Sequence, residues 1–246
     1  DDPTDNTYHV VRAKGTREQP ITKSCQLNGF IIQEGYATKT HGGGLDLDFA
    51  SPVIVNCLFR DHYAEYSGGA VDCFKSYPDF GNVIFRGNIS GSSGGAVEIS
   101  TFNDTHVDFY NCVWYDNHSN RGGAIDGNDK VFIYNSIFLN NSASSSAYTD
   151  NVSEAEMYNS IVESINSFNN NFFANPQFID AANGDFRLRK GTPAINKGNQ
   201  EVIPGWLQTD FYGNARVLGD TVDIGAFEGS VETPVQKIPA DQEILS

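Results

Sequence analysis

A pair of glycines returns at nearly constant intervals in the first half of this 246-residue chain. The pairs begin at Gly42, Gly68, Gly94 and Gly122, so they are 26, 26 and 28 residues apart. Repeats of roughly 20 to 50 residues are typical of solenoids, because a unit that short cannot bury its own apolar face and must stack on its neighbours. The interval therefore predicts a fold built of successive coils.

A second repeated phrase, centred on asparagine, indicates what each coil contains. It reads "VNCLFRDH" at 55–62, "GNVIFRGN" at 81–88 and "YNCVWYDN" at 110–117, and its asparagines are Asn56, Asn82, Asn111, Asn135 and Asn159. Two positions before the asparagine lie Ile54, Phe80, Phe109, Ile133 and Met157, and three positions after it lie Phe59, Phe85, Trp114, Phe138 and Val162. Alternation of this kind predicts short strands separated by turns.

We therefore predict an all-β fold, a right-handed parallel β-helix in which each repeat forms one coil. Equivalent residues of stacked parallel strands lie about 4.8 Å apart, so each column of the repeat becomes a ladder in space. The aromatic column is expected to stack inside the coil. The asparagine column is expected to form a buried ladder of amides bonded to one another.

The repeat ends before the chain does, which predicts a division of the sequence. We expect coils over residues 1–165, a C-terminal cap module over 166–228 packed on the helix end, and a tail over 229–246. A cap would cover the exposed strands of the last coil. Its charged residues are expected to form a buried ion network that fixes it, or else a catalytic or ligand site: Asp185, Arg187, Asp210, Arg216, Asp223 and Glu228.

Charge and composition exclude several classes of partner. The chain has 31 acidic and 16 basic residues, a net charge of −15, which repels nucleic acids and anionic membranes. No apolar run approaches the roughly 20 residues of a membrane helix, so we expect no direct membrane insertion. The four cysteines lack zinc-binding spacing and are predicted to be free, buried thiols.

Two sets of motifs resemble known families. The "GGA[IV]" and F-x-x-N phrases resemble repeats of polymorphic outer-membrane proteins. The phrases "NPQFID" at 175–180, "GDFRLRKGTPAINKG" at 184–198 and "TDFYGNARVLGDTVDIGAFE" at 209–228 resemble the closing module of choice-of-anchor Q proteins. This resemblance implies a bacterial, exported β-helix, extracellular or displayed on the cell surface. It also implies that the chain is part of a larger chain or assembly.

An acidic residue follows each glycine pair at the same offset, which predicts a ladder of carboxylates on one outer face: Asp46, Asp72, Glu98 and Asp126. Three interpretations follow. The ladder could be a solvated acidic face, a Ca²⁺ site formed by Asp46, Asp48 and Asp72, or a site for carbohydrate chemistry. Ca²⁺ prefers six to eight oxygen ligands, more than a bare ladder offers, and no other cofactor is predicted.

Carbohydrate chemistry would use Asp72 and Glu98, because glycosidases hold two carboxyl groups about 5 Å or about 6.5–9.5 Å apart. Lys75 and His106 are the further catalytic candidates. The candidate sugar-binding residues are two loop aromatics and two arginines of another column: Tyr77, Phe102, Arg60 and Arg86.

Two functions remain open from the sequence. The first is a secreted or cell-surface scaffold or adhesin that contacts a polysaccharide, a cell-surface glycan or other surface partners. The alternative is a polysaccharide-degrading enzyme, a lyase or a glycosidase, acting on an extracellular polysaccharide. No GxSxG, HExxH or phosphate-binding glycine loop points to any other chemistry.

Overall fold

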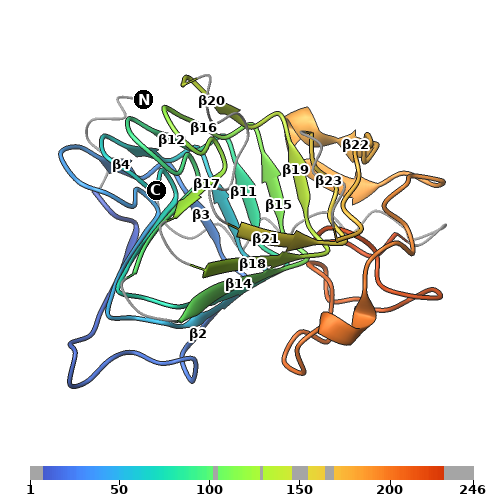
Figure 1. Ribbon diagram of the computed structural model, residues 1–246, viewed down its shortest axis with the longest axis horizontal. Coiled ribbons are helices and arrows are strands. Elements are labelled where there is room, and N and C mark those ends of the chain that lie inside the picture. The colour runs from blue at the N-terminus through green and yellow to red at the C-terminus, as the bar shows by residue number, and fades with distance from the viewer. Residues whose placement is uncertain (1–7, 102–104, 128–129, 146–154, 164–168, 230–246) are drawn as a thin grey trace.

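The protein is a parallel β-helix of about five turns, with almost no helix (Figure 1). The computed structural model describes residues 8–101, 105–127, 130–145, 155–163 and 169–229. The predicted fold class is confirmed. None of the described helices is long and apolar enough to span a membrane.

Each complete coil contributes one strand to each of four parallel sheets, numbered here in the order in which the chain visits them. The first sheet contains β1 (Val11–Lys14), β5 (Leu45–Asp48), β9 (Val71–Phe74), β13 (Val97–Ser100) and β17 (Ile125–Gly127). The second contains β2 (Gln26–Asn28), β6 (Val53–Val55), β10 (Asp79–Gly81), β14 (His106–Tyr110), β18 (Lys130–Tyr134) and β21 (Ala155–Tyr158).

The remaining two sheets complete each coil. The third contains β3 (Ile31–Gln33), β7 (Leu58–Arg60), β11 (Ile84–Arg86), β15 (Val113–Tyr115) and β19 (Ile137–Leu139). The fourth contains the two-residue strands β4 (Tyr36–Ala37), β8 (Tyr63–Ala64), β12 (Ile89–Ser90), β16 (His118–Ser119) and β20 (Ser142–Ala143).

The aromatic column stacks inside the coil as expected. Ring centroids of Phe59 and Phe85 are 5.5 Å apart, those of Phe85 and Trp114 are 5.4 Å apart, and those of Trp114 and Phe138 are 4.3 Å apart. All four rings are buried. Three of the four cysteines, Cys57, Cys73 and Cys112, are also buried and free, whereas Cys25 is free and exposed.

The asparagine column is a ladder, but it lies at the turn between the second and third sheets. All five asparagines have φ between 51° and 53°, the left-handed region that asparagine tolerates better than most residues. Asn82 donates from Nδ2 to Asn56 Oδ1 at 2.8 Å, and Asn135 to Asn111 at 3.5 Å. A second ladder, wholly inside the coil, links Asn88, Asn117 and Asn141 through Nδ2–Oδ1 contacts of 2.9 and 2.8 Å.

The C-terminal segment extends the last coil and then covers the outer face of the third sheet. Phe172 bridges to Ile161 and so extends the last coil. The chain then returns along the outside of the third sheet, where β22 (Phe178–Asp180) and β23 (Asp185–Leu188) flank the short helix η2 (Ala181–Asn183) (Figure 1). A second short helix, η3 (Gln200–Val202), follows β23. The segment packs against the third sheet because that sheet is apolar on its outer face as well, at Ile31, Leu58, Ile84, Val113 and Ile137.

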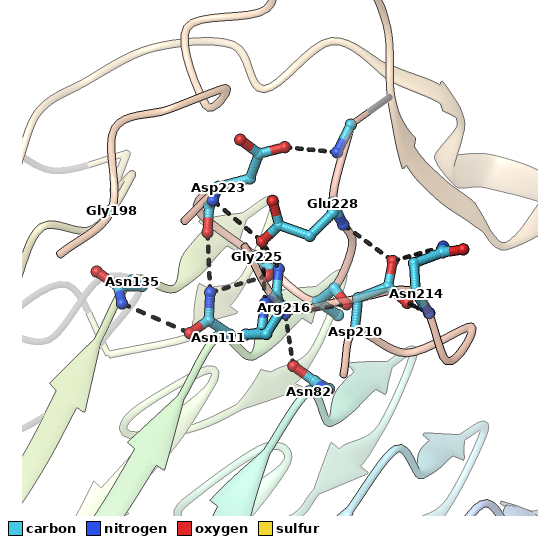
Figure 2. A network of polar contacts seen from close by, with 12 residues as sticks. Asn82, Asn111, Asn135, Gly198, Asp210, Asn214, Arg216, Asp223, Gly225 and Glu228 are labelled. Carbon is cyan, nitrogen blue, oxygen red and sulfur yellow. Dashed lines mark hydrogen bonds and ion pairs between the residues drawn. The ribbon is translucent and has the colours of Figure 1, made fainter. Parts of the chain in front are cut away.

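Four of the six charged residues predicted to fix this segment form a buried network with the asparagine ladder (Figure 2). Arg216 donates from Nη2 to Glu228 Oε1 at 2.5 Å and from Nη1 to Asn82 Oδ1 at 2.6 Å. Asp210 accepts from the Glu228 amide at 3.1 Å, and Asp223 accepts from the Asn196 amide at 2.7 Å. This network joins the C-terminal segment to the coils. Asp185 and Arg187 pair with each other instead.

Asn111 allows the backbone and side-chain contributions of this ladder to be separated. Its Nδ2 donates to the carbonyls of Asp223 at 2.8 Å and Gly225 at 3.2 Å. We expect Asn111→Gly, which accepts positive φ, to lower the free energy of unfolding by about 1–3 kcal/mol through the lost buried hydrogen bonds. Asn111→Ala should cost about 1 kcal/mol more, because it also strains the backbone. Urea titration of both variants would measure this, and equal stabilities would contradict it.

Candidate functional site

The glycine pairs explain why an acid follows at a fixed offset. Gly68, the first glycine of its pair, has φ of 64°. The second glycine, Gly69, lies so close to the next coil that an added Cβ would be 2.1 Å from the carbonyl oxygen of Gly95. The pair therefore makes the turn into the first sheet and lets the coils approach closely. The strand that follows begins with an inward apolar residue, so the next residue, the acid, points outward.

The predicted carboxylate ladder is present and in register. Asp46 pairs with Asp72, Asp72 with Glu98, and Glu98 with Asp126 across adjacent strands of the first sheet. The ladder is not a solvated face, however, because Asp72 is only 7% exposed and Asp126 only 2%. The interpretation as an open acidic surface is therefore wrong for these two side chains.

Positive charge compensates the two ends of the ladder but not its middle. Arg12 Nε lies 2.8 Å from Asp46 Oδ2, and Arg121 Nη2 lies 2.5 Å from Asp126 Oδ2. In contrast, the nearest basic group to Asp72 among the described residues is His41, whose Nδ1 is 3.9 Å from Oδ1. Glu98 accepts hydrogen bonds from the hydroxyls of Ser93 at 2.8 Å and Ser100 at 3.4 Å.

The environment of the two middle carboxyl groups favours their protonated forms. Burial raises the pKa of Glu98 to about 7, and the charge of Asp126 adds to the rise. Burial likewise holds the pKa of Asp72 well above its usual range, with further contributions from Glu98, Asp46 and Asp48. Glu98 therefore titrates near neutral pH, and the neighbouring Asp72 holds its proton to a higher pH than an exposed aspartate would.

The structure gives the predicted Ca²⁺ site no metal-like geometry. Asp46 is paired with Arg12, and Lys14 Nζ lies 2.9 Å from Asp48 Oδ2. Over the described ranges of the chain, no three His, Cys, Asp or Glu side chains gather as a metal site.

Lys75 and Tyr77 line a pocket of about 600 Å³. The pocket lies where the first sheet turns into the second, across the first three coils, and its lining includes Arg17, Lys23, Phe49, Lys75 and Tyr77. The Tyr77 amide donates to Ser51 Oγ at 2.8 Å, which connects the turn of the third coil to the equivalent turn of the second coil. Part of the wall comes from the long segment between β1 and β2, dark blue in Figure 1.

The other predicted residues lie elsewhere. His106 is on the second sheet, where its Nε2 is 3.2 Å from Asp108 Oδ2, so it does not join the Asp72–Glu98 pair. Arg60 and Arg86 share a column of the third sheet, where Arg60 Nε donates to Gln33 Oε1 at 2.8 Å and Arg86 Nη2 to the Ala182 carbonyl at 2.7 Å. Phe102 lies outside the described residues.

The sequence reasoning missed a second row of polar residues on the second sheet. Asp79 and Asp108 are in register, and Lys23 Nζ lies 2.5 Å from Asp79 Oδ1. Beside them Tyr110, Tyr134 and Tyr158 stack at centroid distances of 5.3 and 5.4 Å. The repeat carried this signal, because each aspartate directly precedes an inward phenylalanine and each tyrosine directly precedes the repeated asparagine.

No family model matches the chain, and no match was found among curated proteins or solved structures. Functional inference for this chain therefore rests on the geometry of the pocket and of the carboxyl pair.

The raised pKa of Glu98 predicts how stability depends on pH. Because the folded state holds the proton more tightly than the unfolded chain, whose Glu pKa is about 4.5, the free energy of unfolding should fall as the pH rises from 4.5 through about 7. Glu98→Gln keeps an acceptor for Ser93 and should reduce this fall, by on the order of 2 kcal/mol between pH 5 and pH 8. Thermal unfolding of both proteins at the two pH values measures it; identical pH profiles would contradict the assignment.

Proposed function

We propose that this chain is a secreted or cell-surface β-helix protein that binds glycans. The observation that supports this most directly is the pocket of about 600 Å³ at the junction of the first two sheets. Ligand pockets commonly measure about 300–1,000 Å³ and combine apolar or aromatic walls with a few polar groups. The rings of Phe49 and Tyr77 and the hydroxyls of Thr22 and Ser51 are such a combination.

The way the pocket is built also suits binding. Its walls come from the equivalent turns of three successive coils, each held at both ends by strands of the parallel sheets. Phe49 and Lys75, which follow paired residues of adjacent strands, both have φ of 51°, a sparsely populated conformation that the stacked coils maintain. A pre-formed site of this kind loses little conformational entropy when a ligand binds.

Removal of the Tyr77 ring tests glycan binding at the pocket. We expect Tyr77→Ala to weaken binding of the preferred glycan about tenfold, because an aromatic contact contributes roughly 0.5–1.5 kcal/mol beyond its buried area. Tyr66→Ala is the matched control, since Tyr66 is an exposed tyrosine outside the pocket. A glycan array followed by titration calorimetry would measure both; equal losses in the two variants would place binding elsewhere.

A second candidate function, polysaccharide cleavage, rests on the Asp72–Glu98 pair. The two residues pair across adjacent strands, whose backbones lie about 4.8 Å apart. Side chains on such strands can reach the separation of roughly 5 Å at which retaining glycosidases hold their carboxyl groups. Limited access of a substrate to the pair argues against this function, because Asp72 is only 7% exposed. In addition, neither Lys75 nor His106 lies beside the pair. A glycosidase that uses the two carboxyl groups alone fits this arrangement better than a lyase.

Substitution of Asp72 separates the two functions. If the pair cleaves glycosidic bonds, Asp72→Asn should abolish the release of new reducing ends from a polysaccharide panel while the protein stays folded. If the pair is structural, the same change should leave glycan binding unaltered and leave stability unchanged or raised, because it relieves repulsion with Glu98 and Asp46. A depolymerisation assay and a melting curve on the two proteins give the answer.

A further inference from the structure

We infer that the pocket accepts an anionic sugar residue, one that bears a carboxylate or a sulfate, and that Arg17 and Lys75 bind its charged group. This inference rests on the proposed glycan binding and names the class of glycan. It depends on the charge of the pocket lining, which is opposite to the charge of the chain as a whole.

Arg17 and Lys75 are basic residues of the pocket lining that no carboxylate in the described part of the chain neutralises. With 31 acidic residues against 16 basic ones, carboxylates are abundant, and Arg12, Lys14 and Arg121 each contact one. No carboxylate of the described residues lies within 4.0 Å of a side-chain nitrogen of Arg17 or Lys75. Two uncompensated cations therefore line one pocket, and an anion entering it would meet no closely paired acid that it has to displace.

The surroundings of Lys75 hold its ammonium group in place without neutralising it. Nζ lies 4.9 Å from the ring centroid of Phe49 and 4.5 Å from that of Phe74. Cation–π contacts of this kind restrict the long side chain but leave its charge free to attract an anion. The half-buried Lys75 stem also contributes apolar wall, so this residue can contact both the ring and the charged group of a sugar acid.

Arg17 and Lys23 complete the charge pattern. The guanidinium of Arg17 is exposed on the segment before β2, and its planar fork matches the two oxygens of a carboxylate or sulfate. Lys23 lines the same pocket but is neutralised by Asp79, 2.5 Å away. The attraction is therefore concentrated at Arg17 and Lys75, whereas the Lys23–Asp79 pair can bond neutral hydroxyl groups.

The net charge limits how many anionic groups the ligand carries. At −15, the protein repels extended polyanions over distances of about a Debye length, roughly 8–10 Å in ordinary buffers. Attraction at the pocket acts over a shorter range, on the residue that enters it. A short oligosaccharide with one charged residue in the pocket therefore fits better than nucleic acid or a densely charged polymer.

The test compares an acid with its own neutral form. Calorimetric titrations would use uronic-acid oligosaccharides, their methyl esters of the same length, sulfated oligosaccharides and unsubstituted neutral ones. We expect the acid to bind at least about tenfold more tightly than its ester, since hydrogen bonds to charged groups are stronger than those to neutral ones. Arg17→Gln and Lys75→Met should each remove that preference and change affinity for the ester less than about twofold. Lys190→Met, an exposed lysine outside the pocket, is the control.

Each outcome has a definite meaning. Equal affinity for acid and ester would overturn the anionic inference while leaving glycan binding intact. Binding of the sulfated but not the uronic oligosaccharides, lost in Arg17→Gln, would support the inference and identify sulfate as the source of the charge. An equal loss in Lys190→Met would overturn it, because the effect would then be general electrostatics. No binding to any glycan would refute the proposed function itself. If Lys75→Met melts early, Arg17→Gln, in an exposed loop, decides alone.

Discussion

Backbone hydrogen bonding between successive coils is the interaction on which the whole structure depends. It places each residue directly beside its counterpart in the next coil, so any chemical property of one position is repeated along the helix. Repetition stabilises the helix where equivalent side chains attract one another, as in the stacked rings of Phe59, Phe85 and Trp114. It is unfavourable where identical charges repel, as between Asp72 and Glu98, and here the pKa values of both carboxyl groups are raised while arginines pair with the acids at the two ends of the ladder.

The features of the fold that depend on the repeat period were predictable from the sequence. The glycine pairs and the asparagine phrase together were enough for the fold class, the aromatic stack and the register of Asp46, Asp72 and Glu98, because a parallel ladder converts spacing along the chain into adjacency in space. The period says nothing about how the turns between sheets are shaped. It therefore could not show that His106 would join Asp108, or that Lys75 and Tyr77 would line one pocket with Arg17.

The repeat likewise did not predict that the outer face of the third sheet is buried. The return of the C-terminal segment along the third sheet depends on apolar residues such as Leu58, Ile84 and Val113, whose outward orientation becomes evident only once their neighbours are assigned to the interior. The asparagine column was correctly predicted, but the expectation that each amide bonds the next was wrong between Asn82 and Asn111. There Arg216 donates to the Asn82 side chain, and the carbonyls of Asp223 and Gly225 accept from Asn111 instead.

The position of the pocket across three coils has a consequence for how such a protein can change over evolutionary time. A solenoid gains and loses length by whole repeats, because anything less would put every later column out of register. Coils beyond the third can be added or removed without altering the residues from 17 to 77 that line the pocket. Loss of one of the first three would leave a folded helix with no intact pocket. The pocket and the length of the helix can therefore change independently of each other.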